Sequence, residues 1–182
     1  MSICHIRVGV PVNYQIPETI AGVRTMMKEI GKRSFICENN YFGIRCQIHC
    51  NKDKIQIFAR NFEDISQKYP EIGYVSIFIT KSKEKIKKEI KSFILDCTFL
   101  PYDKKNDKAL HVQEIVFFPK EIIKTGSPTK NNNHICIFCY DILFFNGEIL
   151  IYKSLRERKK VLDSTFCETI SVRFAKRIEL DK

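Results

Sequence analysis

The spacing of hydrophobic residues along this chain changes from a helical period to a strand-like one. In residues 18–31, apolar side chains recur every three or four positions, which predicts a helix that ends near Gly31. From residue 35 onward, short apolar stretches separated by polar residues are typical of strands. We expect strands at Phe35–Glu38, Ile44–Cys50, Lys54–Phe58, Phe93–Leu95 and His134–Phe145.

Turn signals connect several of these strands. Residues 51–53 (Asn-Lys-Asp) predict a hairpin turn between the second and third strands, and residues 146–147 (Asn-Gly) are a strong hairpin signal after the last one. The basic segment Ser154–Leu162 favours a second helix, and the final segment alternates weakly, as an edge strand does. Residues 112–118 fit either a helix or a strand. With no repeat and no linker, a chain of 182 residues predicts one α+β domain.

The chain is strongly basic. It carries 31 Lys and Arg against 21 Asp and Glu, for a net charge of +10, and such an excess favours polyanionic partners through counterion release. A soluble protein that is merely basic remains the alternative. No apolar run approaches the ~20 residues of a membrane-spanning helix, and the N-terminus lacks the apolar centre of a signal peptide. We therefore expect an intracellular protein with no membrane partner.

Two clusters of cysteine and histidine, residues 46–50 (CQIHC) and 134–139 (HICIFC), suggest zinc at first sight. Both clusters fall in strand-like stretches, where residues three apart face opposite sides of a sheet, whereas structural zinc ligands usually occupy tight turns. Reduced thiols in the protein core are the better interpretation. We expect no metal site, and nothing in the pattern positions a Cys/His nucleophile pair.

Four further stretches carry the strongest functional signal, because they follow one another in a fixed order. They are residues 38–45 (ENNYFGIR), 58–72 (FARNFEDISQKYPEI), 93–98 (FILDCT) and 140–148 (YDILFFNGE), the last followed by 155–162 (LRERKKVL). Their order and spacing resemble the adenylation domain of eukaryotic-type ATP-dependent DNA ligases, over about residues 8–179. The second stretch separates ligases from mRNA capping enzymes, which share only the first.

This resemblance implies a fold, namely an α+β nucleotidyltransferase core of antiparallel sheets with flanking helices, in one domain spanning residues 1–182. In such ligases, later motifs supply a metal-binding glutamate and two phosphate-binding lysines, and an OB-fold domain closes over the nucleotide. The sequence reaches Lys182 without these motifs. We therefore expect a truncated adenylation domain that lacks the OB-fold.

The resemblance also implies lost chemistry. The ligase lysine that attacks the α-phosphate of ATP is replaced by Asn40, and a carboxamide cannot act as that nucleophile. The following aspartate is replaced by Phe42, and a ribose-contacting glutamate by Thr98. The sequence thus predicts a pseudoenzyme without catalytic residues. A relocated lysine, such as Lys32 or Lys54, is the alternative, although one amine cannot replace several missing motifs.

Some ligand-facing positions of the family are retained. The resemblance implies adenine recognition at Glu38 and an adenine-flanking ring at Tyr140. It also implies a ribose or phosphate contact at Arg45 and a contact with nucleotide or nucleic-acid backbone at Arg60. These residues favour residual AMP or ATP binding by a nucleotide-binding regulatory protein, with no other cofactor. Alternatively, they are retained because the fold packs around them, with Phe42 filling a pocket that no longer holds phosphate.

Three basic segments favour a nucleic-acid surface instead. Nearby aromatic residues (Tyr102, Phe117, Phe118 and Tyr152) could stack on unpaired bases or belong to the core. We expect a non-enzymatic scaffold, an RNA-binding component of a ribonucleoprotein particle such as the ribosome, with a DNA-binding ligase remnant as the alternative. The first would be cytoplasmic and the second nuclear. The predicted contacts are Lys81, Lys83, Lys85, Lys87, Lys88, Lys91, Arg156, Arg158, Lys159, Lys160, Arg173, Lys176 and Arg177.

Overall fold

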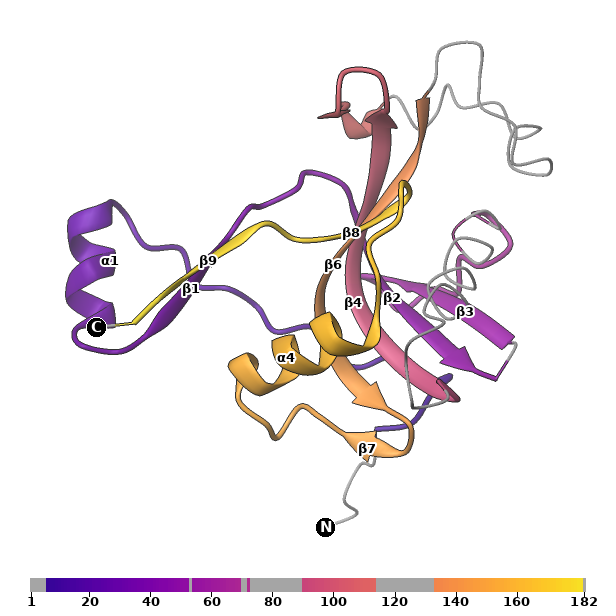
Figure 1. The fold of residues 1–182 in the computed structure, drawn as a ribbon, viewed down its shortest axis with the longest axis horizontal. Coiled ribbons are helices and arrows are strands. Elements are labelled where there is room, and N and C mark those ends of the chain that lie inside the picture. Colours follow the sequence, from indigo (N-terminus) through magenta and orange to yellow (C-terminus); the bar gives the residue numbers. More distant parts are fainter. Residues whose placement is uncertain (1–5, 53, 70–71, 73–89, 114–132, 182) are drawn as a thin grey trace. The chain divides into compact units, whose positions relative to one another are not determined.

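Contacts within the chain divide it into two compact units, and Figure 1 labels most of their helices and strands. The larger unit comprises Met1–Val12 and Tyr41–Phe174, and the smaller unit comprises Asn13–Asn40 and Ala175–Lys182. Among the described residues, no helix is both long enough and apolar enough to cross a membrane. The structure, a computed structural model, describes residues 6–52, 54–69, 72, 90–113 and 133–181.

The smaller unit combines one helix with a two-stranded sheet. β1 (Phe35–Glu38) pairs antiparallel with β9 (Arg177–Leu180), which confirms the first predicted strand and places a strand in the weakly alternating final segment. α1 (Val23–Ile30) is shorter than the helix predicted for residues 18–31. Gly22 explains the later start, because its φ of 81° is incompatible with a right-handed helix running through it.

The larger unit is built on a seven-stranded sheet. Its strands are β2 (Ile44–Asn51), β3 (Lys54–Ala59), β4 (Ser92–Asp103), β5 (Lys108–Ala109), β6 (Asn133–Phe145), β7 (Glu148–Ile149) and β8 (Val172–Phe174). The strand order is β3-β2-β4-β6-β7, with β5 paired to β4 and β8 paired to β6. Each pair is antiparallel except β6 with β8, so the sheet is mixed but predominantly antiparallel.

Two tight turns set the registers of neighbouring strands. β2 and β3 form a hairpin in which Asn51 pairs with Lys54, and Lys52 has a left-handed φ of 54°. β6 and β7 are joined by Asn146 and Gly147, whose φ values of 45° and 92° suit the type I′ turn that Asn-Gly sequences favour. Both predicted hairpins are confirmed.

One face of the seven-stranded sheet forms the main core. Because side chains alternate along a strand, Ile48, Leu95 and Ile137 point to the same side, where they belong to one buried cluster. α4 (Leu155–Thr165) packs against β6 on this side, and Leu162 joins the cluster. The predicted helix at Ser154–Leu162 is therefore confirmed, and burial of its apolar stripe holds it in place.

The opposite side of the sheet, called the mixed face below, carries polar and aromatic residues. Arg45, Asp96 and Tyr140 each neighbour core residues along β2, β4 and β6, so they point to this other side. Such polar residues interrupt the apolar pattern of β4. The pattern therefore predicts a strand only at Phe93–Leu95, although the pairing runs from Ser92 to Asp103.

β4 and β6 pair along most of their length, with two interruptions. The register shifts by one residue at each, and Tyr140 and Leu143 are the additional residues on β6. Such β-bulges bend a strand and reorient its side chains. The carbonyl of Leu143 accepts a hydrogen bond from the amide of Leu150 at 2.9 Å. Neither bulge is evident from the hydrophobic pattern of the strand.

Buried thiols line the core side of the sheet, in agreement with the interpretation of the cysteines as core residues. Cys46, Cys97 and Cys139 are aligned across β2, β4 and β6, and the Sγ atoms of the last two lie 3.4 Å apart. Burial raises the pKa of Cys97 well above its ordinary value, so its thiol stays protonated at neutral pH. In the part of the chain that the structure describes, no group of three or more His, Cys, Asp and Glu could hold a metal ion.

His49 is buried on the mixed face as a neutral ring. Its Nδ1 accepts a hydrogen bond from the amide of Gly9 at 3.1 Å, and its Nε2 lies 3.2 Å from Oε1 of Gln47. Its ring packs edge-on against Phe58. Burial lowers the pKa of His49 from 6.5 to about 4. A proton on Nδ1 would face the Gly9 amide hydrogen, which also opposes the charged form.

Acid should therefore destabilise the protein before most carboxylates titrate. In the unfolded chain His49 binds a proton below pH ~6.5, whereas in the folded chain it does so only near pH 4. The free energy of unfolding therefore falls as the pH is lowered from ~6.5 to ~4, by roughly 3 kcal/mol at most. Urea unfolding at pH ~7 and pH ~4.5 measures the loss. His49→Gln cannot titrate and should remove much of the difference. An equal loss in the wild type and the variant would show that other groups are responsible.

Candidate nucleotide and nucleic-acid site

The ligase-like motif at residues 38–45 is divided between the two units. Glu38 is the last residue of β1 in the smaller unit, and Asn40 is an exposed residue of that same unit. The remainder of the motif, from Tyr41 to Arg45, belongs to the larger unit. The other residues predicted to face a nucleotide also lie there, and their geometry follows.

Gly43 brings the motif into close contact with β4. A Cβ atom at this position would lie 2.5 Å from both the carbonyl oxygen of Phe99 and the Cγ2 atom of Thr98, closer than any side chain tolerates. Nearby, the ring of Tyr41 stacks on Phe138 with centroids 3.8 Å apart. The glycine of the motif is therefore a packing requirement of this fold, independent of any chemistry.

Arg45 forms an ion pair on the mixed face. Its Nε and Nη2 atoms donate to the two carboxylate oxygens of Asp96, at 2.9 and 2.5 Å, which is the fork geometry of a strong pair. Its guanidinium carbon lies 5.3 Å from the centre of the Tyr140 ring. Burial is the dominant influence on Asp96 and raises its pKa, although Arg45 acts in the opposite direction. Sequence reasoning missed Asp96, even though it lies within the matched stretch 93–98.

Tyr140, the additional residue at one bulge of β6, connects the motif to the sheet. Its hydroxyl accepts a hydrogen bond from the amide of Tyr41 at 3.0 Å, and it also bonds to Thr98. Burial raises the pKa of this hydroxyl, and the two hydrogen bonds partly offset that effect. Thr98 thus contacts Tyr140 at a position where the resemblance implies a glutamate. Arg45 and Tyr140, where the resemblance implies nucleotide contacts, lie together with Thr98, where it implies a lost one.

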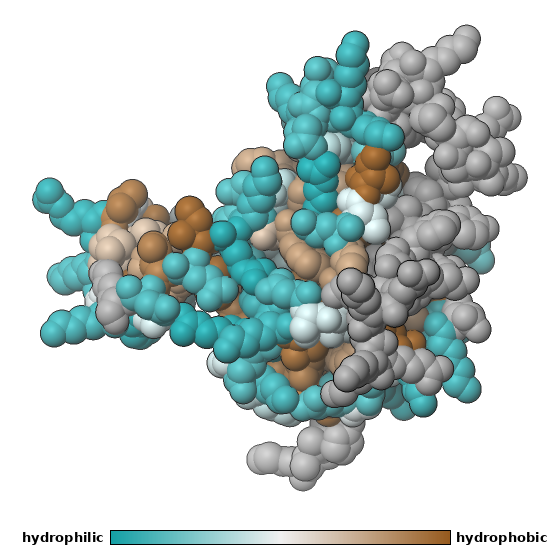
Figure 2. Space-filling model, viewed as in Figure 1, coloured by the Kyte–Doolittle hydropathy of each residue, from teal (hydrophilic) through white to brown (hydrophobic). Residues whose placement is uncertain are grey.

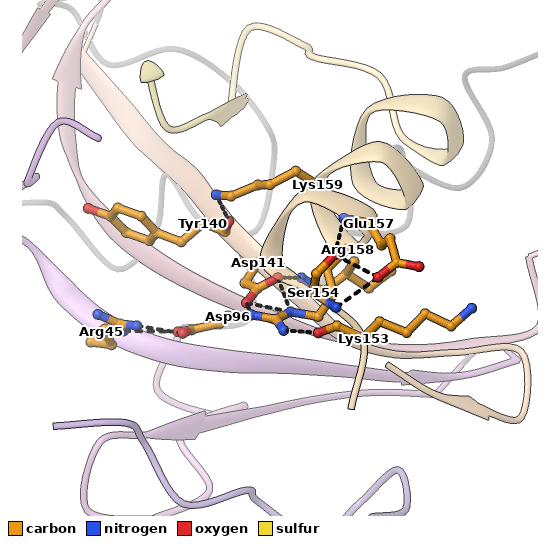
Figure 3. Close-up of polar contacts among 10 residues, drawn as sticks. Arg45, Asp96, Tyr140, Asp141, Lys153, Ser154, Glu157, Arg158 and Lys159 are labelled. Carbon is orange, nitrogen blue, oxygen red and sulfur yellow. Dashed lines mark hydrogen bonds and ion pairs between the residues drawn. The ribbon is translucent and has the colours of Figure 1, made fainter. Parts of the chain in front are cut away.

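The main-chain carbonyl of Tyr140 is bonded by a buried lysine (Figure 3). Lys159 is only 1% exposed, and its Nζ donates to this carbonyl. It lies on the same side of α4 as Leu162 and Phe166, at helical spacings of three and seven. The prediction that Lys159 belongs to a basic surface is wrong, because this stripe faces the sheet. The spacing from Leu162 and Phe166 was the signal that could have shown it.

Arg158 is a second cation of α4 that points inward. Its Nε and Nη2 atoms donate to the carboxylate of Asp141 at 2.8–3.0 Å, and its Nη1 donates to the carbonyl of Lys153 at 2.7 Å (Figure 3). Neither side chain of the ion pair is more than 16% exposed. A capping box between Ser154 and Glu157 fixes the helix start. Arg158 was predicted to contact nucleic acid, but it joins α4 to β6 instead.

Two arginines near the end of the chain also have carboxylate partners. Nη2 of Arg173 lies 2.7 Å from Asp107, and its guanidinium lies 4.6 Å from the centre of the Tyr102 ring. Tyr102 is itself only 4% exposed, so it belongs to the core and is not available to stack on a base. Nε of Arg177 lies 3.4 Å from Glu179 in the smaller unit.

The remaining predicted contacts include several exposed cations. Lys91, Lys160 and Lys176 are exposed, as is Arg60, and Arg156 is half-buried. Their predicted contact with nucleic acid stays a prediction. The residues that lie outside the described part of the chain are Lys81, Lys83, Lys85, Lys87 and Lys88, together with Phe117 and Phe118.

Removing the buried lysine should cost more stability than removing its neighbour. Lys159→Met leaves the Tyr140 carbonyl without its donor, and an unpaired buried carbonyl costs about 1–3 kcal/mol. Lys160→Met, the same substitution at an exposed position of the same helix, should change the free energy of unfolding by less than about 0.5 kcal/mol. Urea denaturation of both variants tests this. Equal losses would contradict the inward role of Lys159.

Gly43→Ala should destabilise the larger unit by about 1–3 kcal/mol, because the new methyl group would overlap the backbone of Phe99. Phe42→Ala, one position earlier and 81% exposed, should be nearly neutral. Thermal unfolding monitored by circular dichroism compares the two. If Gly43→Ala keeps the wild-type midpoint, the close packing described above is wrong.

Relatives of this chain are found among curated proteins. DNA ligase 1 of Schizosaccharomyces pombe is 32% identical over 164 residues, which cover 90% of this chain and 20% of that protein. DNA ligase 1 of Dictyostelium discoideum is 32% identical over 168 residues, which cover 91% and 13%. DNA ligase 2 of Korarchaeum cryptofilum is 30% identical over 183 residues, which cover 97% and 28%. The chain thus spans a small part of each relative, 20% in the case of the S. pombe protein.

Solved structures share the fold. A mycobacterial DNA ligase D, complexed with ATP and MES, aligns with a TM-score of 0.57 at 12% identity, over 80% of this chain and 40% of that one. The ligase domain of the M. tuberculosis enzyme aligns with a TM-score of 0.56 at 12% identity, over 81% and 41%. These alignments confirm the predicted α+β nucleotidyltransferase core. The family profile described as "ATP dependent DNA ligase domain" matches residues 15–182, and the chain therefore belongs to that family.

Proposed function

We propose that this ligase-family domain binds nucleic acid without transferring adenylate. The observation that carries the proposal is Asn40, at the position where the family motif has its nucleophilic lysine. The nitrogen of a carboxamide shares its lone pair with the adjacent carbonyl, so it cannot attack a phosphorus atom as a free amine does. Without the nucleophile, the covalent step of adenylation has no acceptor at this position.

Two lysines of the larger unit are poor replacements for that nucleophile. Nζ of Lys159 is buried and already donates to the Tyr140 carbonyl. Lys54 pairs with Asn51 at the hairpin turn, which lies six residues along β2 from Arg45, or roughly 20 Å at ~3.3 Å per residue. Phosphoryl transfer depends on positioning to within about an ångström, so an amine at that distance cannot substitute.

The contacts on the mixed face also argue against nucleotide binding in this domain. Arg45 bonds both oxygens of Asp96, and the Tyr140 hydroxyl bonds the Tyr41 amide and Thr98. A nucleotide would have to compete with these internal bonds for the same groups. The alternative is a regulatory protein that holds AMP or ATP. It requires the nucleotide to displace these internal bonds, and it is supported by Arg45, whose side chain is still 43% exposed.

The nucleic-acid half of the proposal is supported by charge and by kinship. The net charge of +10 favours binding to phosphate backbones. The relatives are named DNA ligases, which favours DNA as the ligand. The sequence also led to a more specific hypothesis, an RNA-binding scaffold of a particle such as the ribosome. The same net charge supports that hypothesis. Competition between DNA and RNA of one sequence distinguishes the two.

Incubation with ATP labelled at the α-phosphate, in the presence of magnesium, should leave no covalent label on the protein. The reason is the missing amine at Asn40. DNA ligase 1 of S. pombe, assayed in parallel, serves as the positive control. A labelled band on this protein would contradict the proposal, and peptide mapping would then show whether Lys32 or Lys54 carries the adenylate.

Binding to nucleic acid should weaken steeply with salt. For B-DNA the logarithm of the binding constant falls against the logarithm of salt concentration with a slope of about −0.9 per neutralised phosphate. Fluorescence anisotropy with a labelled duplex measures this slope, and Lys160→Gln should reduce it by about 1 if the lysine contacts a phosphate. A salt-independent affinity, or no binding at low salt, would overturn the nucleic-acid half of the proposal.

A further inference from the structure

Phe42 is an aromatic side chain on the surface of the larger unit. It is 81% exposed, whereas most phenylalanines of a folded protein are buried. Burying such a ring stabilises a protein by about 1.5–3 kcal/mol, and the fold does not gain this stabilisation from Phe42. On the face shown in Figure 2, hydrophobic residues are scattered among hydrophilic ones, so an apolar side chain at the surface is not unusual by itself. Exposure alone therefore does not distinguish Phe42. What distinguishes it is the fixed backbone on both sides of the residue.

The backbone on both sides of Phe42 is held in place. On one side, the ring of Tyr41 stacks on Phe138 with an interplanar angle of 17°. On the other, Gly43 lies directly against Thr98 and Phe99 of β4. A hydrogen bond from the Gly43 amide to the Tyr41 carbonyl, at 2.9 Å, spans the residue between them. The segment thus presents an exposed aromatic ring from a fixed backbone, so a ligand that covers it need not order a loose loop.

The surroundings favour a nucleic-acid base as the ligand of this ring. Stacking of a base on an aromatic ring tolerates any sequence, because every base has a π face. The chain has a net charge of +10, which attracts the phosphates that accompany each base. On the mixed face, Asp96 is neutralised by its ion pair with Arg45, so its carboxylate opposes an incoming phosphate less than an unpaired one would.

We propose that Phe42 is a stacking platform for an unpaired base, so that the domain prefers single-stranded nucleic acid to intact duplex. In a duplex the faces of each base are covered by neighbouring base pairs, whereas a single strand offers them freely. The substitution that removes the motif carboxylate therefore also adds a base-binding side chain. This inference rests on the proposed nucleic-acid function and names the form of nucleic acid that this site takes.

Tryptophan fluorescence tests the contact directly, because the chain contains no Trp. Phe42→Trp makes position 42 the sole tryptophan, and saturating single-stranded oligo(dT) should quench it strongly, whereas a blunt hairpin duplex should not. Ile16→Trp is the matched control, since Ile16 is 82% exposed, and neither ligand should quench it. Unchanged fluorescence at position 42 with bound oligonucleotide would overturn the inference, as would equal quenching by the single strand and the duplex.

Affinity gives an independent check. Phe42→Ala should weaken binding to oligo(dT) by about 5- to 150-fold, which corresponds to ~1–3 kcal/mol for one stacked base. Phe42→Tyr keeps an aromatic face and should bind within a few-fold of the wild type. If the wild type binds oligo(dT) and Phe42→Ala binds equally well, this inference is wrong and the proposed function stands. If the wild type binds no nucleic acid at low salt, the proposed function itself fails.

Discussion

The one-residue bulge at Tyr140 in the pairing of β6 with β4 determines the geometry of this site. Without it, Asp141 would follow Cys139 onto the core side by simple alternation, whereas the bulge puts Ile142 there instead. The main-chain carbonyl at the bulge is bonded by Lys159 of α4, and the neighbouring Asp141 by Arg158. The bulge and the helix therefore depend on each other, since either one alone would leave buried polar groups unpaired.

Two arginines of this basic protein are paired with carboxylates in the larger unit. Arg45 is matched by Asp96 and Arg158 by Asp141, so these two arginines neutralise carboxylates inside the unit. The excess of +10 must act through other cations, of which Lys160 is one exposed example. A ligase needs its positive groups directed at a triphosphate. In this domain, Arg45, where the resemblance implies a ribose or phosphate contact, bonds Asp96 instead and so contributes to holding the mixed face together.

Much of this fold follows from local sequence chemistry. The features that could not be predicted share one cause. The Asn-Gly turn at residues 146–147 and the hairpin of β2 with β3 were predictable because turn residues act locally. The bulge at Tyr140 and the hydrogen bond from Lys159 to its carbonyl were not, because each depends on a partner far along the chain. A lysine among basic neighbours indicates a solvated face unless its spacing from buried residues is considered. The motif stretches contain Arg45, Thr98 and Tyr140, but they did not reveal the ion pair of Arg45 with Asp96 or the hydrogen bond of Tyr140 with Thr98.

Calorimetric titration of the wild-type protein with ATP, and separately with an oligonucleotide at the same low salt, tests the central claim most directly. The account predicts saturable binding of the oligonucleotide and no saturable binding of ATP, because the groups that would hold the nucleotide already bond Asp96, Thr98 and Tyr41. Tight ATP binding that Arg45→Ala abolishes, with no affinity for the oligonucleotide, would contradict it and would assign this domain to nucleotide sensing.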